Sequence, residues 1–123
     1  MKIVLTGDPR TKKNSARILR SGSGTPFVAP SKAFVEYQTA CLWQIRSPPE
    51  PISAPVNVRC VYYMATRHKV DLANLLEATC DILVKAGVLA DDNSRIVAAH
   101  DGSRVDYDKT APRAEIWIEE IGL

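Results

Sequence analysis

Hydrophobic and polar residues alternate along residues 56–64 and 114–120, as they do in β-strands with one buried face. A weaker alternation around Ile3-Val4-Leu5 predicts a first strand over residues 2–6. Three shorter segments are further strand candidates: residues 26–29, 95–100 and 104–105. Residues 7–25 are polar and contain glycine, so a long loop is expected there.

Apolar residues recur at helical spacing in two other segments, and each segment is preceded by a residue that can cap a helix. Ser31 precedes a helix that should run to about Arg46, because the prolines that follow cannot continue it. Asp71 precedes a second helix, which should end at Gly87. The order β-β-α-β-α-β-β predicts an α/β (α+β) fold, a small mixed β-sheet with two helices packed on it. The length fits one domain over residues 1–123.

The composition is that of an ordinary globular protein, with 46% hydrophobic and 24% charged residues. The longest uncharged stretch, residues 21–31, has 11 residues and is mostly polar. A membrane helix needs about 20 apolar residues, so no membrane partner is expected. The N-terminal residues are too short of apolar positions for a signal-peptide core, which favours a cytoplasmic protein.

Cysteine and glycine usage exclude several kinds of site. Cys41, Cys60 and Cys80 are odd in number and form no C-x-x-C pair, which argues against a disulfide framework or a zinc site. They are expected to be buried thiols. No glycine-rich cofactor loop is present, so no organic cofactor is expected.

The charges are unevenly distributed along the chain. Residues 1–47 hold eight Lys/Arg and two acidic residues, a net +6, whereas residues 48–123 hold eight and twelve, a net −4. Lysine and arginine in a loop can neutralise DNA phosphates, although a solvated charged loop is an equally good interpretation. The candidates are Arg10, Lys12, Lys13, Asn14 and Arg17, together with Lys69 after the strand at residues 56–64.

Three aspartates flank the second predicted helix. Asp71 precedes it, and Asp91 and Asp92 follow it. A helix of 16 residues is roughly 24 Å long, so these carboxylates meet only if residues 88–90 run back along the helix or if two subunits share the site. Clustered carboxylates would hold Mg²⁺ for phosphate chemistry. The competing interpretation is an N-cap followed by an ordinary polar turn.

The adjacent pair His100-Asp101 is a third, weaker candidate for acid–base or metal chemistry. One adjacent pair does not define a site, and a histidine satisfied by structural contacts explains it equally well. No Ser/His/Asp set can be assembled from the sequence.

The segment from Asp71 to Asp92 resembles the RusA family of Holliday-junction resolvases, small endonucleases associated with phages and prophages. The resemblance is carried by Asp71-Leu72-x-Asn74-Leu75, by Asp81-x-Leu83 and by Lys85-Ala86-Gly87-Val88-x-x-Asp91-Asp92. The segment Pro9-x-x-Lys12-Lys13-Asn14 and the final strand, Ala114-Glu115-Ile116-Trp117-Ile118, match the family layout too.

The resemblance implies a homodimer that binds four-way DNA junctions and cuts two opposing strands with Mg²⁺, for which Mn²⁺ could substitute. Carried over by position, it places metal ligands at Asp71, Asp91 and Asp92, and phosphate contacts in the basic loop at Lys12 and Lys13.

Two positions depart from the family pattern, and they leave alternatives open. Ala73 stands where the family commonly has a second aspartate, and Glu77 stands where it usually has a lysine. Because both lie on one helical face, Glu77 could act as a substitute ligand or base. The leading hypothesis is a Mg²⁺-dependent junction endonuclease. A junction-binding protein without cleavage is the second hypothesis, and a small-molecule phosphohydrolase using His100 and Asp101 is the third.

Overall fold

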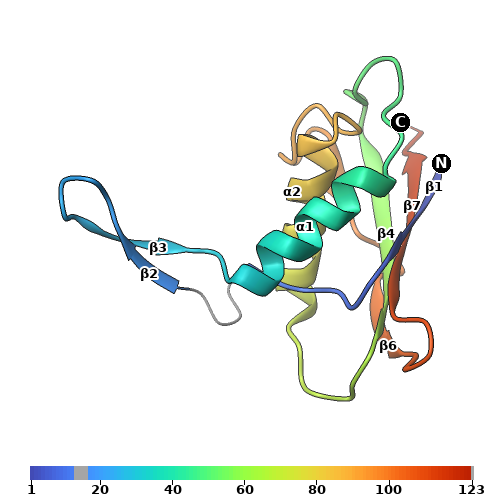
Figure 1. The fold of residues 1–123 in the computed structure, drawn as a ribbon. Helices are drawn as coiled ribbons and strands as arrows, with labels where there is room; N and C mark the ends of the chain where they lie inside the picture. Colours follow the sequence, from blue (N-terminus) through green and yellow to red (C-terminus); the bar gives the residue numbers. More distant parts are fainter. Residues whose placement is uncertain (13–16, 123) are drawn as a thin grey trace.

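A computed structural model, which describes residues 1–12 and 17–122, has a mixed β-sheet covered on one face by two helices (Figure 1). This is the α+β arrangement expected from the sequence. The sheet contains β1 (Lys2–Thr6), β4 (Val56–Met64), β5 (Val97–Ala99), β6 (Arg104–Tyr107) and β7 (Arg113–Glu120). The helices are α1 (Lys32–Gln44) and α2 (Leu72–Lys85), and β2 (Arg17–Arg20) and β3 (Pro26–Ala29) form a separate hairpin.

The sheet is built around β4, which pairs antiparallel with β7 along one side, and β7 in turn pairs antiparallel with β1. On its other side, β4 pairs in parallel first with β5 and then with β6. Between these two short strands, side chains bond the edge of β4. His100 Nδ1 lies 2.8 Å from the Val58 carbonyl oxygen, and Ser103 Oγ accepts from Cys60 N at 3.0 Å.

The core lies between the helices and one face of the sheet. The alternation seen in the sequence explains this face, because the inward positions of β4 and β7 are apolar. They are Val56, Val58, Cys60, Tyr62, Ala114, Ile116 and Ile118, all less than 5% exposed. Cys41, Cys60 and Cys80 are buried free thiols, as expected.

Both helices begin at the predicted capping residues. Ser31 Oγ accepts from Phe34 N, and Asp71 Oδ1 accepts from Ala73 N at 2.9 Å and from Asn74 N at 3.4 Å. Gly87 follows α2 with a φ of +75°, a conformation that favours glycine. In the described part of the chain, neither helix is long and apolar enough to cross a membrane.

The expected loop over residues 7–25 is wrong in its second half. Arg17–Arg20 forms β2, which pairs antiparallel with β3, so a β-hairpin projects from the body of the protein (Figure 1). All four residues of β2 are exposed. A strand without a buried face shows no alternation, so the periodicity on which strand prediction depends was absent.

The Tyr62 hydroxyl supplies a buried polar link between β4 and α2. It lies 2.6 Å from Thr79 Oγ1 and donates to the Leu75 carbonyl at 3.0 Å. We expect Tyr62→Phe to lower the free energy of unfolding by about 1 kcal/mol, because it removes a buried hydrogen-bonding group and leaves the ring in place. Urea denaturation would measure this, with Tyr107→Phe as the partly exposed control. An unchanged unfolding free energy would contradict the prediction.

Candidate active site and DNA-binding surface

A pocket of about 300 Å³ lies where one face of α2 meets the segment that follows the helix. Four of its residues come from α2, one from the turn after the helix, and two from β5 and its end. They are Ala73, Leu76, Glu77, Cys80, Asp92, Val97 and His100. The pocket therefore joins two acidic side chains and an imidazole that are far apart in the sequence.

The chain forms this pocket because it turns back after α2. Leu89 makes a parallel bridge to Ile52, and Ala90 N donates to the Ile52 carbonyl at 2.9 Å. Asn93 then accepts from Ile96 N through its carbonyl oxygen, which leads the chain into β5. Of the two geometries left open by the sequence, the chain itself returns toward the helix. It reaches the pocket at Asp92, beside Glu77 rather than beside the helix start.

The other two predicted ligands make local structural contacts. Asp71 caps α2, and Asp91 Oδ1 and Oδ2 accept from Asp92 N and Asn93 Nδ2 at 2.8 and 2.9 Å. These hydrogen bonds lower the pKa of the Asp91 carboxyl, chiefly the bond from the Asp92 backbone. Neither Asp71 nor Asp91 is among the described residues that line the pocket.

The donors of the pocket fit a hard divalent cation that is held partly by its substrate. Among residues 1–12 and 17–122, no three His, Cys, Asp or Glu side chains are grouped closely enough to hold a metal ion. Mg²⁺, however, commonly takes only one or two carboxylates from the protein and completes its shell with water and substrate phosphates. Glu77 and Asp92, which line one pocket, supply that number.

Cys80 lines the pocket without offering a thiolate. Burial, and then the negative charges of Cys60 and Asp92, raise the pKa of the Cys80 thiol to about 12. The thiol is therefore protonated at neutral pH, and a thiolate is the form that binds metals. Oxygen donors and the His100 ring are left as the polar groups of this site.

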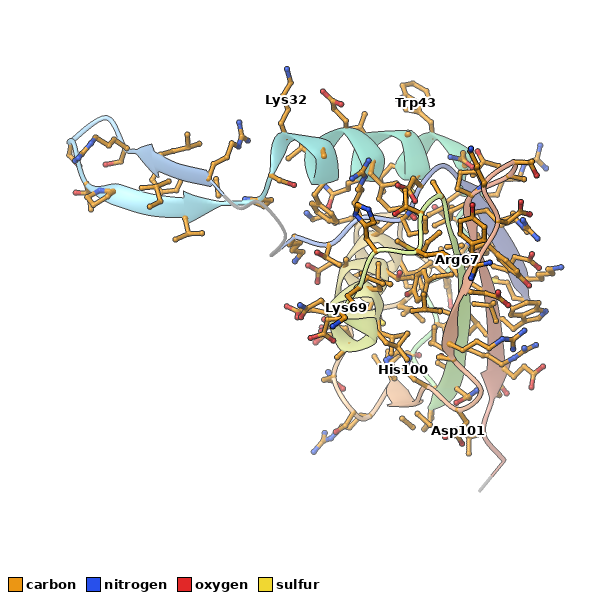
Figure 2. All side chains as sticks on the ribbon, turned by 90° about the horizontal axis from the view of Figure 1, so that it is seen from below. Lys32, Trp43, Arg67, Lys69, His100 and Asp101 are labelled. Atoms are coloured by element: carbon orange, nitrogen blue, oxygen red, sulfur yellow. The ribbon has the colours of Figure 1, made fainter. Side chains whose placement is uncertain are left out.

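His100 and Asp101, paired in the sequence, have separate surroundings. His100 lines the pocket with Glu77 and Asp92, beside the end of α2 in Figure 2. Asp101 is held through its backbone, because its N donates to Asn57 Oδ1 at 2.7 Å and its carbonyl accepts from Asn57 Nδ2 at 3.2 Å. The geometry thus associates His100 with the acidic pocket.

A basic surface lies where β4 ends and the chain leads into α2. One hollow there is lined by residues that include Arg10, His68 and Lys69. A neighbouring hollow shares His68 and includes Arg67, whose guanidinium stacks over the Tyr107 ring at 4.1 Å. Arg67 and Lys69 lie on the same connection in Figure 2. Because Lys69 is two residues before Asp71, this surface adjoins the start of α2.

Some of the predicted DNA-binding residues have partners within the protein. Lys12 Nζ is paired with Asp81, Arg10 lies 3.6 Å from Asp8, and Arg17 Nε donates to the Pro30 carbonyl at 3.1 Å. Lys13 and Asn14 lie outside the described residues. Near the basic surface, Arg113 is shared between Asp108 and Glu115, and the pKa values of both carboxyls are lowered, that of Asp108 to about 2.

A comparison with protein families decides between the classes of function that this geometry allows. The model of the endodeoxyribonuclease RusA family matches residues 6–119, nearly the whole chain. The chain belongs to the RusA family. A search of curated proteins gave no match. Membership of the RusA family implies endodeoxyribonuclease chemistry of the Holliday-junction resolvase type.

Membership also gives the two departures from the RusA pattern a common location. Ala73 and Glu77 line the same pocket, four residues apart on α2, so the change at each position alters one site. A carboxylate is absent at 73 and present at 77.

Sequence reasoning did not place His100 with Glu77 and Asp92. Only the pairing of β5 with the start of β4 brings it there, and nothing local in the sequence reports that pairing. Arg67 was also left out of the predicted DNA-binding residues, although its place in the run Arg67-His68-Lys69 was a usable signal.

Proposed function

We propose that this protein is a Mg²⁺-dependent endodeoxyribonuclease that resolves four-way DNA junctions in the cytoplasm. The observation that carries the proposal is the pocket shared by Glu77 and Asp92 in a chain of the RusA family. Asp71 and Asp91, the ligands expected from the resemblance, support it from the helix cap and the turn. Mn²⁺ would substitute for Mg²⁺.

In this mechanism, Glu77 and Asp92 hold the divalent cation together with the scissile phosphate. The bound cation lowers the pKa of its water and neutralises charge on the phosphate. The carboxylates of the pocket orient that water, and the second of them can accept its proton. Arg10, Lys69 and Arg67 hold the flanking phosphates, which fixes the strand next to the start of α2 without reading its sequence.

A homodimer supplies two such pockets, which paired cuts in opposing strands require. Apolar side chains exposed on the hairpin and on α1 offer surface for that contact. Ile18 and Val28, opposite each other in β2 and β3, are 77% and 74% exposed, and Trp43 is 87% exposed. Figure 2 shows Trp43 pointing away from the body of the protein. An isolated two-stranded hairpin is marginally stable, so a partner would stabilise it.

The test is cleavage of a synthetic four-way junction beside linear duplexes of the same sequence, with Mg²⁺ and with EDTA. Symmetric cuts in opposing strands of the junction, only with Mg²⁺, are expected. Sedimentation of the protein alone and with the junction would measure whether two chains act together. Equal cutting of junction and duplex would contradict junction selectivity, and cutting in EDTA would contradict the metal dependence.

The second candidate is a junction-binding protein that does not cut, and Ala73 is the observation that favours it. The side chain of Ala73 lines the pocket without an oxygen donor. This candidate predicts that the junction is bound equally well with Mg²⁺ and with EDTA, and that no strand is cut under either condition.

The basic surface should show in the salt dependence of binding. We expect Lys69→Gln to weaken junction binding and to reduce the slope of log K against log salt by about 0.9, the value for one lost phosphate contact. The control is Lys32→Gln, because Lys32 points outward from α1 (Figure 2). Fluorescence anisotropy over a range of salt concentrations would measure both slopes. Equal slopes for the two variants would remove Lys69 from the DNA-binding surface.

A further inference from the structure

One nitrogen of the His100 ring has a fixed role in the fold. Nδ1 lies 2.8 Å from the Val58 carbonyl oxygen. A carbonyl only accepts hydrogen bonds, so Nδ1 carries a proton and donates it. In the neutral ring the lone pair is then on Nε2. A ring held in this way, by donation to a backbone carbonyl, is the usual arrangement of metal-binding histidines.

The other ring nitrogen belongs to a residue of the acidic pocket. His100 lines that pocket with Glu77 and Asp92, and Leu76 and Val97 supply apolar parts of its wall. The three polar residues come from three separate segments: α2, the turn after α2, and the end of β5. The pocket thus offers two oxygen donors and one nitrogen donor, and Cys80, protonated, adds no thiolate.

We propose that His100 is a third protein ligand of the metal site, through Nε2, and that it gives the site a preference for transition-metal ions over Mg²⁺. This inference rests on the proposed function for the two carboxylates. Carboxylates suit Mg²⁺ and Mn²⁺, whereas an imidazole strengthens binding of Co²⁺, Ni²⁺ and Zn²⁺ far more than binding of Mg²⁺. His100 thereby replaces a donor at the site where Ala73 offers none.

The site closes by a small movement of Asp92. No three such side chains of the described residues are close enough to hold a metal ion as they stand. Asp92 is exposed on the turn, while Glu77 is carried by a helix and His100 is fixed to β4. Sites of this kind often tighten only when their ligand arrives, so the turn is the segment that would adjust.

The competing explanation of His100 is purely structural. β5 ends at Ala99 and β6 begins at Arg104, and the His100 and Ser103 side chains bond the edge of β4 in between. This role uses Nδ1 and the proposed role uses Nε2, so the two can be separated by substitution. Asn in place of His keeps an amide donor near the position of Nδ1 and removes the nitrogen at Nε2.

The experiment is titration of the metal-free protein with Co²⁺ and with Mg²⁺, followed by calorimetry and by the visible absorption of Co²⁺. We expect His100→Asn to weaken Co²⁺ binding at least about 10-fold, the smallest loss typical of a disturbed metal site, and to change Mg²⁺ binding much less. The control, His68→Asn, alters the other histidine, which is exposed and lies outside the pocket. Unchanged Co²⁺ affinity in His100→Asn would overturn the proposal.

A second measurement covers the case in which His100→Asn loses stability. In the unaltered protein, Mn²⁺ should broaden the NMR signals of the His100 ring at concentrations that leave His68 sharp. Equal broadening of both rings would overturn the proposal. The outcome is independent of cleavage: Co²⁺ bound through His100 in a protein that cuts no junction contradicts the nuclease. Junction cutting with unchanged Co²⁺ affinity in His100→Asn contradicts this inference alone.

Discussion

Asp92→Asn is expected to reduce the rate of junction cleavage by at least about 100-fold and to leave junction binding intact. Asparagine keeps the shape of the side chain and removes the charge that a divalent cation requires. Loss of groups that only support a metal ligand already costs 10- to 100-fold in activity, and Asp92 lines the pocket directly. Single-turnover cleavage with saturating protein, beside anisotropy for binding, would measure the two effects separately.

Asp91→Asn is the matched control, because it makes the same chemical change one residue away. The Asp91 carboxylate accepts hydrogen bonds from Asp92 N and Asn93 Nδ2, and these bonds lower its pKa. We therefore expect a smaller loss of cleavage from Asp91→Asn than from Asp92→Asn. If Asp91→Asn proved the more damaging, the assignment of the ligand to Asp92 would be wrong.

The sequence predicted those elements of the fold whose residues repeat with a clear period. β4 and β7 alternate because one side faces the helices, and Ser31 and Asp71 mark the starts of the helices by capping chemistry. β2 was missed because Arg17–Arg20 buries none of its side chains, and β5 and β6 because they are short. Pairing along the single edge of β4 defines these two strands, and local sequence carries no record of it.

The candidate site was predictable only in part. The helix spacing places Ala73 and Glu77 on one face from sequence alone. The position of Asp92 depends on the bridge between Ile52 and Leu89, two residues that are far apart in the chain. The distance from Asp71 to Asp92 along a straight helix suggested that they could not meet without such a return. The return ends at Glu77, which makes this residue the partner of Asp92.

The pairing of Glu77 with Asp92 predicts that a carboxylate can be moved between positions 77 and 73. We expect Glu77→Gln to reduce cleavage by at least about 100-fold, and Ala73→Asp in the same chain to restore most of the lost rate. Position 73 tolerates aspartate because it lies in the first turn of α2, where the helix dipole favours negative charge. Cleavage rates of the single and double variants would measure the rescue.

Ala73→Asn in the Glu77→Gln chain is the control, since it adds the same bulk without charge and should rescue nothing. A double variant with aspartate at 73 that cuts no faster than Glu77→Gln would show that Glu77 does not replace the family's second aspartate. If the unaltered protein cuts nothing and Ala73→Asp alone creates cleavage, the pocket is a disabled one. The function would then be junction binding, because the same surface and the same pocket would hold DNA but lack one charge needed to cut it.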